Sequence, residues 1–388
     1  GADKVASSLM RGLPFERLIV LINKDDDVSI LLAGELPATV FIEKYNLLTI
    51  PNLLVGAKTH KIKIIRQILV VFSQLLRYPL FIFSIFYFYA KMVRLNPDVF
   101  IANNGGYPAG DYCRSATIAA SLRSGIKVVH VVHNMAVASP WFRVGFEWFI
   151  DRLIDSRSTL VAVSERAAKQ LNKVRWIKQN PIVVYNGVEM RPKKMAGKKG
   201  KVFTILNVGY FGLVKNQKLL IDVFASLVIK GHSEIRLTFI GAETEEGYQE
   251  ECRKMVAELG VEKLVNFLGF MEEPEVWYQE ADVFVLCSII EGFPMTVLEA
   301  MRASTPVIAT DVGGVGEQVS DGETGFIIRE GDRKSLAEVL EIVISDENLC
   351  RRLGESGRKR FEERYTVETM ISQYAKLLGL SGQNVISK

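Results

Sequence analysis

Short apolar strands alternate with amphipathic helices through the second half of the chain, and this alternation constrains the fold most strongly. The helix expected after Asn216 carries one apolar stripe, made of Leu219, Leu220, Val223, Phe224, Leu227 and Val228. Strands are expected at residues 203–208, 236–241, 265–270, 281–286 and 306–310. Because strands that alternate with helices usually pair in parallel, the pattern predicts a doubly wound α/β sheet.

The first half of the chain predicts a second unit of the same class. Strands are expected at residues 18–22, 40–42, 98–102 and 127–132, and helices at residues 4–13, 111–122 and 143–154. A chain of 388 residues is long enough for two domains, and its 48% hydrophobic and 24% charged content is typical of a globular protein.

Composition also excludes several classes of function. The net charge of +4 is too small for a general nucleic-acid binder. The four cysteines are scattered without a zinc spacing, which predicts no metal site and a reducing compartment. The three acids at residues 25–27 follow a strand and could bind a metal ion, but a polar turn is the favoured interpretation.

Two glutamates eight positions apart, Glu291 and Glu299, bracket the start of a predicted helix. Pro294 suits the first helical position, where its missing N–H costs nothing. A helix N-terminus offers unpaired N–H groups to a phosphate or diphosphate, and carboxylates on either side accept hydrogen bonds from hydroxyls. A helix start between two carboxylates therefore predicts a nucleotide-sugar ligand, which has a diphosphate between two groups with hydroxyls.

This segment resembles the E-x7-E motif of glycosyltransferase family 4, retaining enzymes of the GT-B fold. Two glutamates on a helix are usually only solvated, so the resemblance depends on what surrounds them: Gly-Phe-Pro at 292–294, Gly-Gly at 313–314 and Asp-Gly-Glu-Thr-Gly-Phe at 321–326. It implies two Rossmann-like doubly wound domains facing a cleft. The expected parts are an acceptor-binding domain at 1–187 that lacks the family's first strand, a basic linker at 188–201, a donor-binding domain at 202–363 and a bracing helix at 364–388.

The resemblance implies a donor site in the second domain. Lys215 matches the family's diphosphate-binding lysine, whereas Tyr210 stands where the family has an arginine, which puts diphosphate affinity and catalysis in question. Glu291 would hold the sugar hydroxyls and Glu299 the ribose. The full set of expected donor residues is Gly209, Tyr210, Lys215, Gly269, Gly292, Phe293, Pro294 and Glu299, with Glu291, His133 and Lys215 in catalysis.

In the first domain, residues 103–108 form a turn at the carboxyl end of a strand, where α/β folds place ligands. Asn103, Gly105 and Gly106 are therefore acceptor-side candidates, together with Asn134. His133, at the end of the next strand, resembles the family's histidine beside the transferred sugar. A structural histidine is the alternative interpretation.

No acidic residue occurs between Glu43 and Asp98, while an aromatic stretch fills residues 78–90. The same region holds eight basic residues, namely Lys44, Lys58, Lys61, Lys63, Arg66, Arg77, Lys91 and Arg94. Thirteen apolar residues are too few to span a bilayer. The region predicts peripheral membrane contact through residues 58–94, and a buried domain helix is the alternative.

The implied activity is metal-independent, cofactor-free retaining transfer of a hexose. The donor is a nucleotide-sugar, UDP- rather than GDP-linked, and the acceptor is a glycan or polyprenyl-linked molecule of bacterial surface polysaccharide or glycolipid synthesis. The expected location is the cytoplasm, at the inner face of the membrane. The alternatives are a non-catalytic nucleotide-sugar binder and a sugar-nucleotide epimerase. A dehydrogenase is disfavoured because no G-x-G-x-x-G follows a strand.

Overall fold

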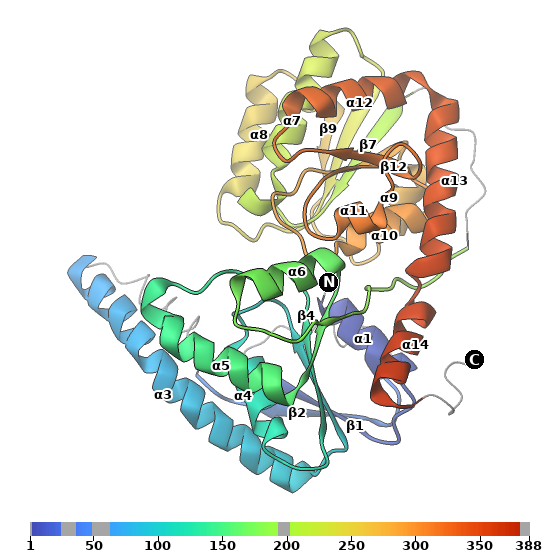
Figure 1. Ribbon diagram of the computed structural model, residues 1–388. Coiled ribbons are helices and arrows are strands. Elements are labelled where there is room, and N and C mark those ends of the chain that lie inside the picture. The colour runs from blue at the N-terminus through green and yellow to red at the C-terminus, as the bar shows by residue number, and fades with distance from the viewer. Residues whose placement is uncertain (1, 25–35, 49–62, 193–201, 381–388) are drawn as a thin grey trace. The chain divides into compact units, whose positions relative to one another are not determined.

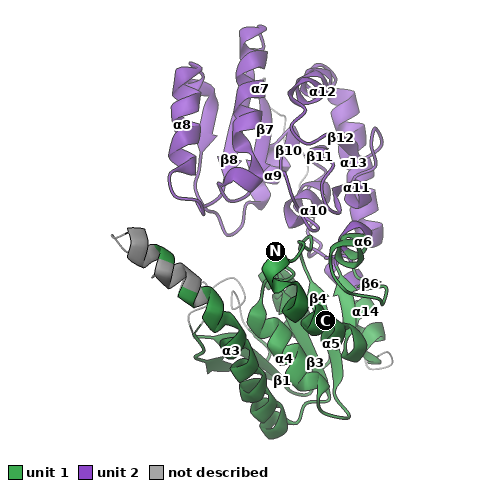
Figure 2. Cartoon of the chain, turned by 60° about the vertical axis from the view of Figure 1, so that its left-hand side comes forward, with its two compact units in different colours: residues 1–162, 168–184, 371–388 green, residues 163–167, 185–370 purple. Residues whose placement is uncertain are grey.

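The protein is represented by a computed structural model that describes residues 2–24, 36–48, 63–192 and 202–380 (Figure 1). The chain forms two compact units (Figure 2). Unit 1 contains Gly1–Ala162, Ala168–Val184 and Ile371–Lys388, and unit 2 contains Val163–Ala167 and Tyr185–Met370. The domain limits expected from the sequence stay predictions.

Unit 2 is built on a six-stranded sheet in which all neighbouring strands are parallel. The strand order is β12-β11-β10-β7-β8-β9. The strands are β7 (Phe203–Val208), β8 (Ile235–Ile240), β9 (Val265–Phe267), β10 (Val283–Leu286), β11 (Val307–Thr310) and β12 (Gly325–Ile328). The chain builds β7, β8 and β9 outward in one direction and then places β10 on the other side of β7. The predicted doubly wound sheet is confirmed, although β9 ends before Gly269.

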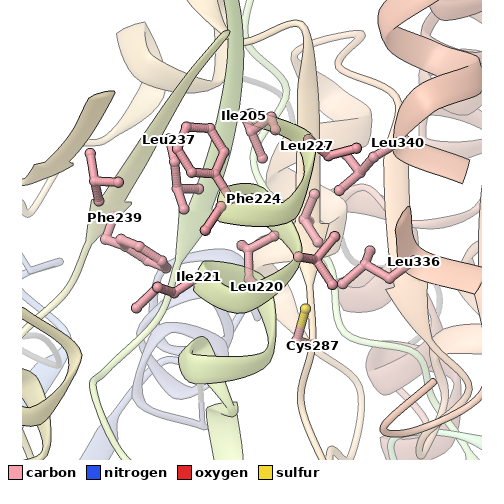
Figure 3. Packing of buried hydrophobic residues seen from close by; sticks show 14 of the residues in the cluster. Ile205, Leu220, Ile221, Phe224, Leu227, Leu237, Phe239, Cys287, Leu336 and Leu340 are labelled. Atoms are coloured by element: carbon pink, nitrogen blue, oxygen red, sulfur yellow. The ribbon is translucent and has the colours of Figure 1, made fainter. Parts of the chain in front are cut away.

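Helices cover this sheet and close its core. They are α7 (Gln217–Ile229), α8 (Tyr248–Glu258), α9 (Glu275–Glu280), α10 (Met295–Arg302), α11 (Val315–Gln318), α12 (Arg333–Ser345) and α13 (Glu347–Arg364). Figure 3 shows Leu220, Phe224 and Leu227 of α7 among the side chains of the sheet and of α12. The predicted stripe of α7 is therefore the centre of the core, and burial of such side chains is the main stabilising contribution.

Unit 1 contains a parallel four-stranded sheet and a separate parallel pair. The strands are β3 (Val99–Asn104), β4 (Lys127–Val132), β5 (Thr159–Ala162) and β6 (Ile182–Val183), with β1 (Leu18–Asn23) and β2 (Val40–Tyr45) as the pair. The helices are α1 (Ala2–Gly12), α3 (Lys63–Leu95), α4 (Asp111–Ser121), α5 (Val144–Arg157), α6 (Glu165–Val174) and α14 (Val367–Leu378), and a short 3-10 helix, η1 (Trp141–Arg143), precedes α5.

The aromatic stretch at residues 78–90 is the middle of α3, a helix of 33 residues that contains Pro79. In the described part of the chain, no helix is both long enough and apolar enough to cross a membrane. The acids predicted to form a turn at residues 25–27, residues 58–62 of the predicted membrane-contact region and the basic run at 193–201 lie outside the described residues.

A buried ion network ties α4, α5 and the end of α6 together in unit 1. Glu147 of α5 accepts hydrogen bonds from the guanidinium groups of Arg114 and Arg175, each at 2.6 Å. Asp151, one turn later, accepts from Arg175 Nε at 2.9 Å and from the hydroxyl of Tyr107 at 2.8 Å. All five residues are buried, so α5 places its charges in the interior.

Candidate functional site

In the sheet of unit 2, the order in which the chain adds strands reverses between β7 and β10, and the candidate site lies at this reversal. In parallel sheets, ligands bind outside the carboxyl ends of the strands where the strand order reverses. The loop after β7 and the loop after β10 are joined there, because the Ile289 amide donates to the Val214 carbonyl at 2.8 Å. Within the strands themselves, the Asn207 side chain of β7 donates to the Val285 carbonyl of β10 at 2.8 Å.

These two loops bring together two of the predicted donor residues, Tyr210 and Lys215, and the predicted catalytic residue Glu291. Lys215 ends the 3-10 helix η2 (Leu213–Lys215), and its Nζ lies 2.5 Å from Glu291 Oε1. The ammonium group also lies 5.0 Å from the centroid of the Tyr210 ring, a cation–π distance. Lys215 and Glu291 side chains are 15% and 11% exposed, so this ion pair is largely shielded from water. The family resemblance implied that these residues belong to one site, and in the structure their side chains lie together.

Glycines let the ends of β7, β8 and β9 approach one another closely. A Cβ on Gly241 would lie 1.9 Å from the Gly209 carbonyl oxygen, so no side chain fits at position 241. The Gly241 amide donates to the Gly269 carbonyl at 2.8 Å. Gly269 has φ +72°, and an added Cβ there would meet no atom within 4 Å. The backbone conformation therefore explains the glycine at 269.

The Gly313-Gly314 turn after β11 packs against the Glu291 loop. Gly313 has φ +52°, and a Cβ there would lie 1.9 Å from the Glu291 carbonyl oxygen. The Gly314 amide donates to the Gly292 carbonyl at 2.8 Å. The Phe293 side chain is buried and stacks on Tyr185 with ring centroids 5.1 Å apart. A role of Phe293 toward a ligand would therefore fall to its backbone, since its ring is part of the core.

Glu299 lies on the second turn of α10, as the sequence predicted. The helix begins at Met295, one residue later than expected, so Pro294 is the N-cap residue and not the first helical residue. Glu299 is 6% exposed, and its Oε2 accepts from the Tyr278 hydroxyl at 3.0 Å. Burial and the Glu299 carboxylate raise the pKa of the Tyr278 phenol well above its ordinary value, so Tyr278 stays a hydrogen-bond donor. The contact of Tyr278 with Glu299 could not be predicted from the sequence, because no local pattern pairs residues 21 positions apart.

In unit 1, the predicted acceptor-side residues surround the carboxyl ends of β3 and β4. His133 follows β4, and its Nε2 lies 2.5 Å from Asn103 Oδ1. Gly105 and Gly106 form the turn after β3, with the Gly106 amide donating to Asn104 Oδ1 at 3.3 Å. Asn134 is exposed, and its Oδ1 accepts from the amide of the next residue at 2.8 Å. Sequence analysis placed Asn103 and His133 at neighbouring strand ends without foreseeing their bond.

His133 is 8% exposed, and burial lowers the pKa of its imidazole to about 3. The ring is therefore neutral at neutral pH and does not serve as a cation for phosphate. Among the described residues, no group of three or more His, Cys, Asp or Glu side chains could hold a metal ion.

Two family models match consecutive parts of the chain. Residues 33–191 match the family described as Glycosyltransferase Family 4, and residues 191–360 match Glycosyl transferases group 1. The capsular polysaccharide biosynthesis glycosyltransferase CapM of Staphylococcus aureus is 30% identical over 287 residues, which is 69% of this chain and 73% of CapM. The putative glycosyltransferase EpsD of Bacillus subtilis is 39% identical over 196 residues, so the chain spans about half the length of that relative.

Solved structures share the fold at low sequence identity. Anabaena HepE, solved in complex with UDP, is 19% identical with a TM-score of 0.74 over 98% of this chain and 96% of HepE. The lipopolysaccharide outer core galactosyltransferase WaaB is 20% identical with a TM-score of 0.67 over 98% of this chain and 96% of WaaB.

Two α/β units with parallel sheets, together with these family matches and structural neighbours, define a glycosyltransferase of the GT-B fold. The chain belongs to the family 4, group 1 glycosyltransferases.

Proposed function

We propose that this protein transfers a hexose from a nucleotide-sugar to a glycan or lipid-linked acceptor during synthesis of a bacterial surface polysaccharide or glycolipid, with retention of configuration. The observation that carries the proposal is the Lys215–Glu291 pair at the strand-order reversal of unit 2. Relatives named for capsular polysaccharide and lipopolysaccharide core synthesis support the acceptor class.

The donor would bind to unit 2. Lys215 and the N-terminus of α10 would hold the diphosphate, which needs a cation and unpaired N–H groups. Glu299 would accept from the ribose hydroxyls and Glu291 from the sugar hydroxyls. Phe293 and Pro294 would contribute only through the start of the helix.

In the reaction, the bond between the anomeric carbon and the diphosphate oxygen breaks, and a bond from that carbon to an acceptor hydroxyl oxygen forms. The acceptor proton leaves with the nucleoside diphosphate. Lys215 and the helix amides would stabilise the charge that develops on the leaving oxygen, so no metal ion is needed. His133 would act as a positioning group beside the transferred sugar, and the loop at Asn103, Gly105, Gly106 and Asn134 would lie on the acceptor side.

We propose UDP rather than GDP as the donor nucleotide, because HepE was solved with UDP and with UDP-glucose. Calorimetric titration of the chain with UDP and with GDP tests this choice. Micromolar binding of UDP, with GDP at least tenfold weaker, is expected. Preference for GDP would overturn the donor assignment, and binding of neither would overturn the nucleotide site.

Tyr210 favours one second candidate, a nucleotide-sugar binder without turnover. A phenol hydrogen-bonds but cannot neutralise a diphosphate as arginine does. Incubation with UDP-glucose, UDP-galactose and their N-acetyl forms, with release of UDP measured against time, separates the two functions. Binding without release for any donor and acceptor tried would favour the binder. Interconversion of the sugars without an acceptor would favour an epimerase.

We also propose that unit 1 contacts the inner face of the cytoplasmic membrane through residues 58–94. One face of α3 packs into unit 1 through Phe81, Ser84, Phe88 and Met92. Its opposite face exposes a stripe at helical spacing: Phe72, Leu75, Ile82, Phe83, Phe86, Tyr89 and Val93. An apolar stripe on the solvent side of a helix is the arrangement of a surface that binds lipid or a partner.

Helix α5 and η1 extend this apolar surface. Tyr78 of α3 and Phe146 of α5 lie with ring centroids 4.1 Å apart, so the two helices are neighbours (Figure 1). The exposed side chains of the η1–α5 segment are Trp141, Phe142, Val144, Trp148 and Phe149, with Trp141 87% exposed. The acids of α5 are buried in the ion network or paired with Arg152, so they do not oppose an anionic lipid surface.

The charged side chains of α3 favour lipid over a protein as the partner of this surface. Among the described side chains of α3 there is no acid, while the Arg94 side chain is 62% exposed. Arg77, Lys91 and Arg94 each pair with an acid of another element, so their attraction for lipid is reduced and the aromatic side chains would supply most of the affinity.

A further inference from the structure

Two histidines of unit 1, His130 in β4 and His133 just after it, are each paired with one of two consecutive asparagines at the end of β3. Asn103 contacts His133, and Asn104 contacts His130. Consecutive residues of a strand point to opposite faces of the sheet, so the two pairs occupy different environments. The hydrogen bonds around each pair determine which ring nitrogen carries the proton.

At His133, the protonated nitrogen is Nε2. Asn103 Nδ2 donates to the Ala2 carbonyl at 3.1 Å, which identifies the other end of the amide as the oxygen. That oxygen, Oδ1, lies 2.5 Å from His133 Nε2 and can only accept. Nε2 must therefore donate, and in a neutral ring Nδ1 is then the bare acceptor.

At His130, the protonated nitrogen is Nδ1. The Thr117 hydroxyl donates to the Cys113 carbonyl at 2.7 Å, so its oxygen is left to accept from His130 Nδ1, also at 2.7 Å. His130 Nε2 then accepts from Asn104 Nδ2 at 3.2 Å. Both nitrogens of His130 have partners within unit 1, and this histidine is structural.

His133 differs because its Nδ1 is buried and has no hydrogen-bond partner among the described residues. A buried acceptor without a donor costs about 1–3 kcal/mol, so such an atom usually has a ligand or water as its partner in the working protein. The backbone amide of His133 is already used by the Asn104 carbonyl at 3.0 Å. The unsatisfied group is therefore one nitrogen lone pair.

We propose that Asn103 is a positioning residue that holds His133 as the Nε2–H tautomer, so that the bare Nδ1 accepts a hydrogen bond from a hydroxyl of a bound ligand. His133 thus acts as an acceptor, and it neither donates a proton nor carries charge. Only the nature of the ligand, a sugar hydroxyl, depends on the proposed function. The tautomer is a property of the free protein.

The first experiment is two-bond 1H–15N correlation spectroscopy of the chain with 15N-labelled histidine rings, at pH 7 and without ligand. The chain has four histidines, and His130→Gln and His133→Gln variants assign the two signals. The expected result is opposite tautomers in one spectrum, Nε2–H for His133 and Nδ1–H for His130. An Nδ1–H or doubly protonated His133 would overturn the proposal.

Two variants test the part played by Asn103. Asn103→Leu removes the acceptor and should give His133 a mixture of tautomers, with the His130 signal unchanged as a check that β3 and β4 are folded. Asn103→Asp keeps an oxygen at the same place and should retain the Nε2–H signal. Thr117→Val, the matched control on the other histidine, should disturb His130 alone. A His133 spectrum unchanged in Asn103→Leu would remove Asn103 from this role.

The ligand is tested by adding UDP-glucose and, separately, UDP. Because Nδ1 would accept from a sugar hydroxyl, UDP-glucose should shift the Nδ1 signal and UDP should not. In turnover, Asn103→Leu should lower kcat by about tenfold to a hundredfold, by analogy with the loss of the orienting partner of a metal-bound histidine. A correct tautomer in a protein that turns over no nucleotide-sugar would refute the proposed function and leave the tautomer assignment standing. Full turnover in Asn103→Leu with a scrambled tautomer would refute the positioning role.

Discussion

The ammonium nitrogen of Lys215 lies 2.5 Å from a carboxylate oxygen of Glu291. Lys215 is on the loop that follows β7, and Glu291 is on the loop that follows the neighbouring strand β10. Without donor, the cation proposed for the diphosphate is thus neutralised by the carboxylate proposed for the sugar. A donor that binds there must share or replace this ion pair. Charge on the two side chains is therefore linked to donor affinity, and substitution of either residue should change binding and turnover in different ways.

Glu291→Gln should separate these two effects. Loss of the carboxylate frees Lys215, so the affinity for UDP should stay the same or rise by up to about threefold. Turnover should fall by about a hundredfold, because the sugar loses a charge-assisted hydrogen bond. Calorimetry with UDP and steady-state rates of UDP release measure the two quantities. Retained turnover would remove Glu291 from the sugar.

Tyr210→Arg should tighten UDP binding by about threefold to tenfold. Tyr210 is 39% exposed, so an added guanidinium would be partly screened, and the gain should decrease as salt is raised. Tyr210→Phe is the matched control, since it keeps the ring over Lys215 and adds no charge. Its UDP affinity should stay within about twofold of the native value. Equal affinities for the two variants would mean that the diphosphate lies elsewhere.

Glu299→Ala should weaken UDP binding by about tenfold or more, because hydrogen bonds to a charged group contribute about 1.5–3 kcal/mol. Tyr278→Phe removes the hydroxyl that donates to Glu299 and keeps the carboxylate, so its effect on UDP affinity should be smaller. Calorimetry of both variants with UDP checks this order. A larger loss in Tyr278→Phe would assign the binding contribution to the tyrosine.

The membrane proposal predicts that the chain sediments with vesicles rich in phosphatidylglycerol and less with phosphatidylcholine vesicles. Trp141→Ser with Phe142→Ser, or Phe83→Ser with Phe86→Ser, should lower the bound fraction by about fivefold or more. Ile229→Ser is the matched control, because this side chain is 79% exposed on unit 2. Equal binding of every variant would refute the lipid surface, and self-association without vesicles would indicate a second copy as the partner.

The buried ion network of α5 predicts acid sensitivity. Burial opposes ionisation of Glu147, but the guanidinium groups of Arg114 and Arg175 outweigh it and lower the pKa of Glu147 from its ordinary value. A carboxyl whose pKa is depressed on folding stabilises the protein above its unfolded pKa, and this stability is lost as pH falls through the folded pKa. Thermal unfolding between pH 7 and pH 3 should show this loss.

Two variants assign that acid sensitivity to the network. Glu147→Gln should be less stable at pH 7 and should lose less on acidification. Arg175→Met should cost about 3–5 kcal/mol at pH 7, because it leaves buried carboxylates without their partner. A native pH profile in Glu147→Gln would assign the acid sensitivity to other groups.

The parallel sheets could be predicted from the sequence because strand periodicity is a local property, and the grouping of Lys215, Tyr210 and Glu291 was implied by the family resemblance of their loops. Sequence reasoning did not predict the bond between Asn103 and His133 or that between Tyr278 and Glu299. Those pairs depend on the register of β3 against β4 and on packing of α9 against α10, which no spacing along the chain encodes. It also missed the exposed aromatic residues of α5, since their direction follows from the burial of Glu147 and Asp151.

The loops that carry Lys215 and Glu291 are joined through main-chain atoms, by the Ile289 amide and the Val214 carbonyl. Main-chain bonds survive when side chains are exchanged. The residues displayed on these loops can therefore be changed while the spacing of the loops is kept, and position 210, where the chain has a tyrosine, is one such position. The same property makes the loop pair a suitable place to graft new donor preferences by saturation of positions 210 and 213, with the glycines at 241 and 313 left untouched.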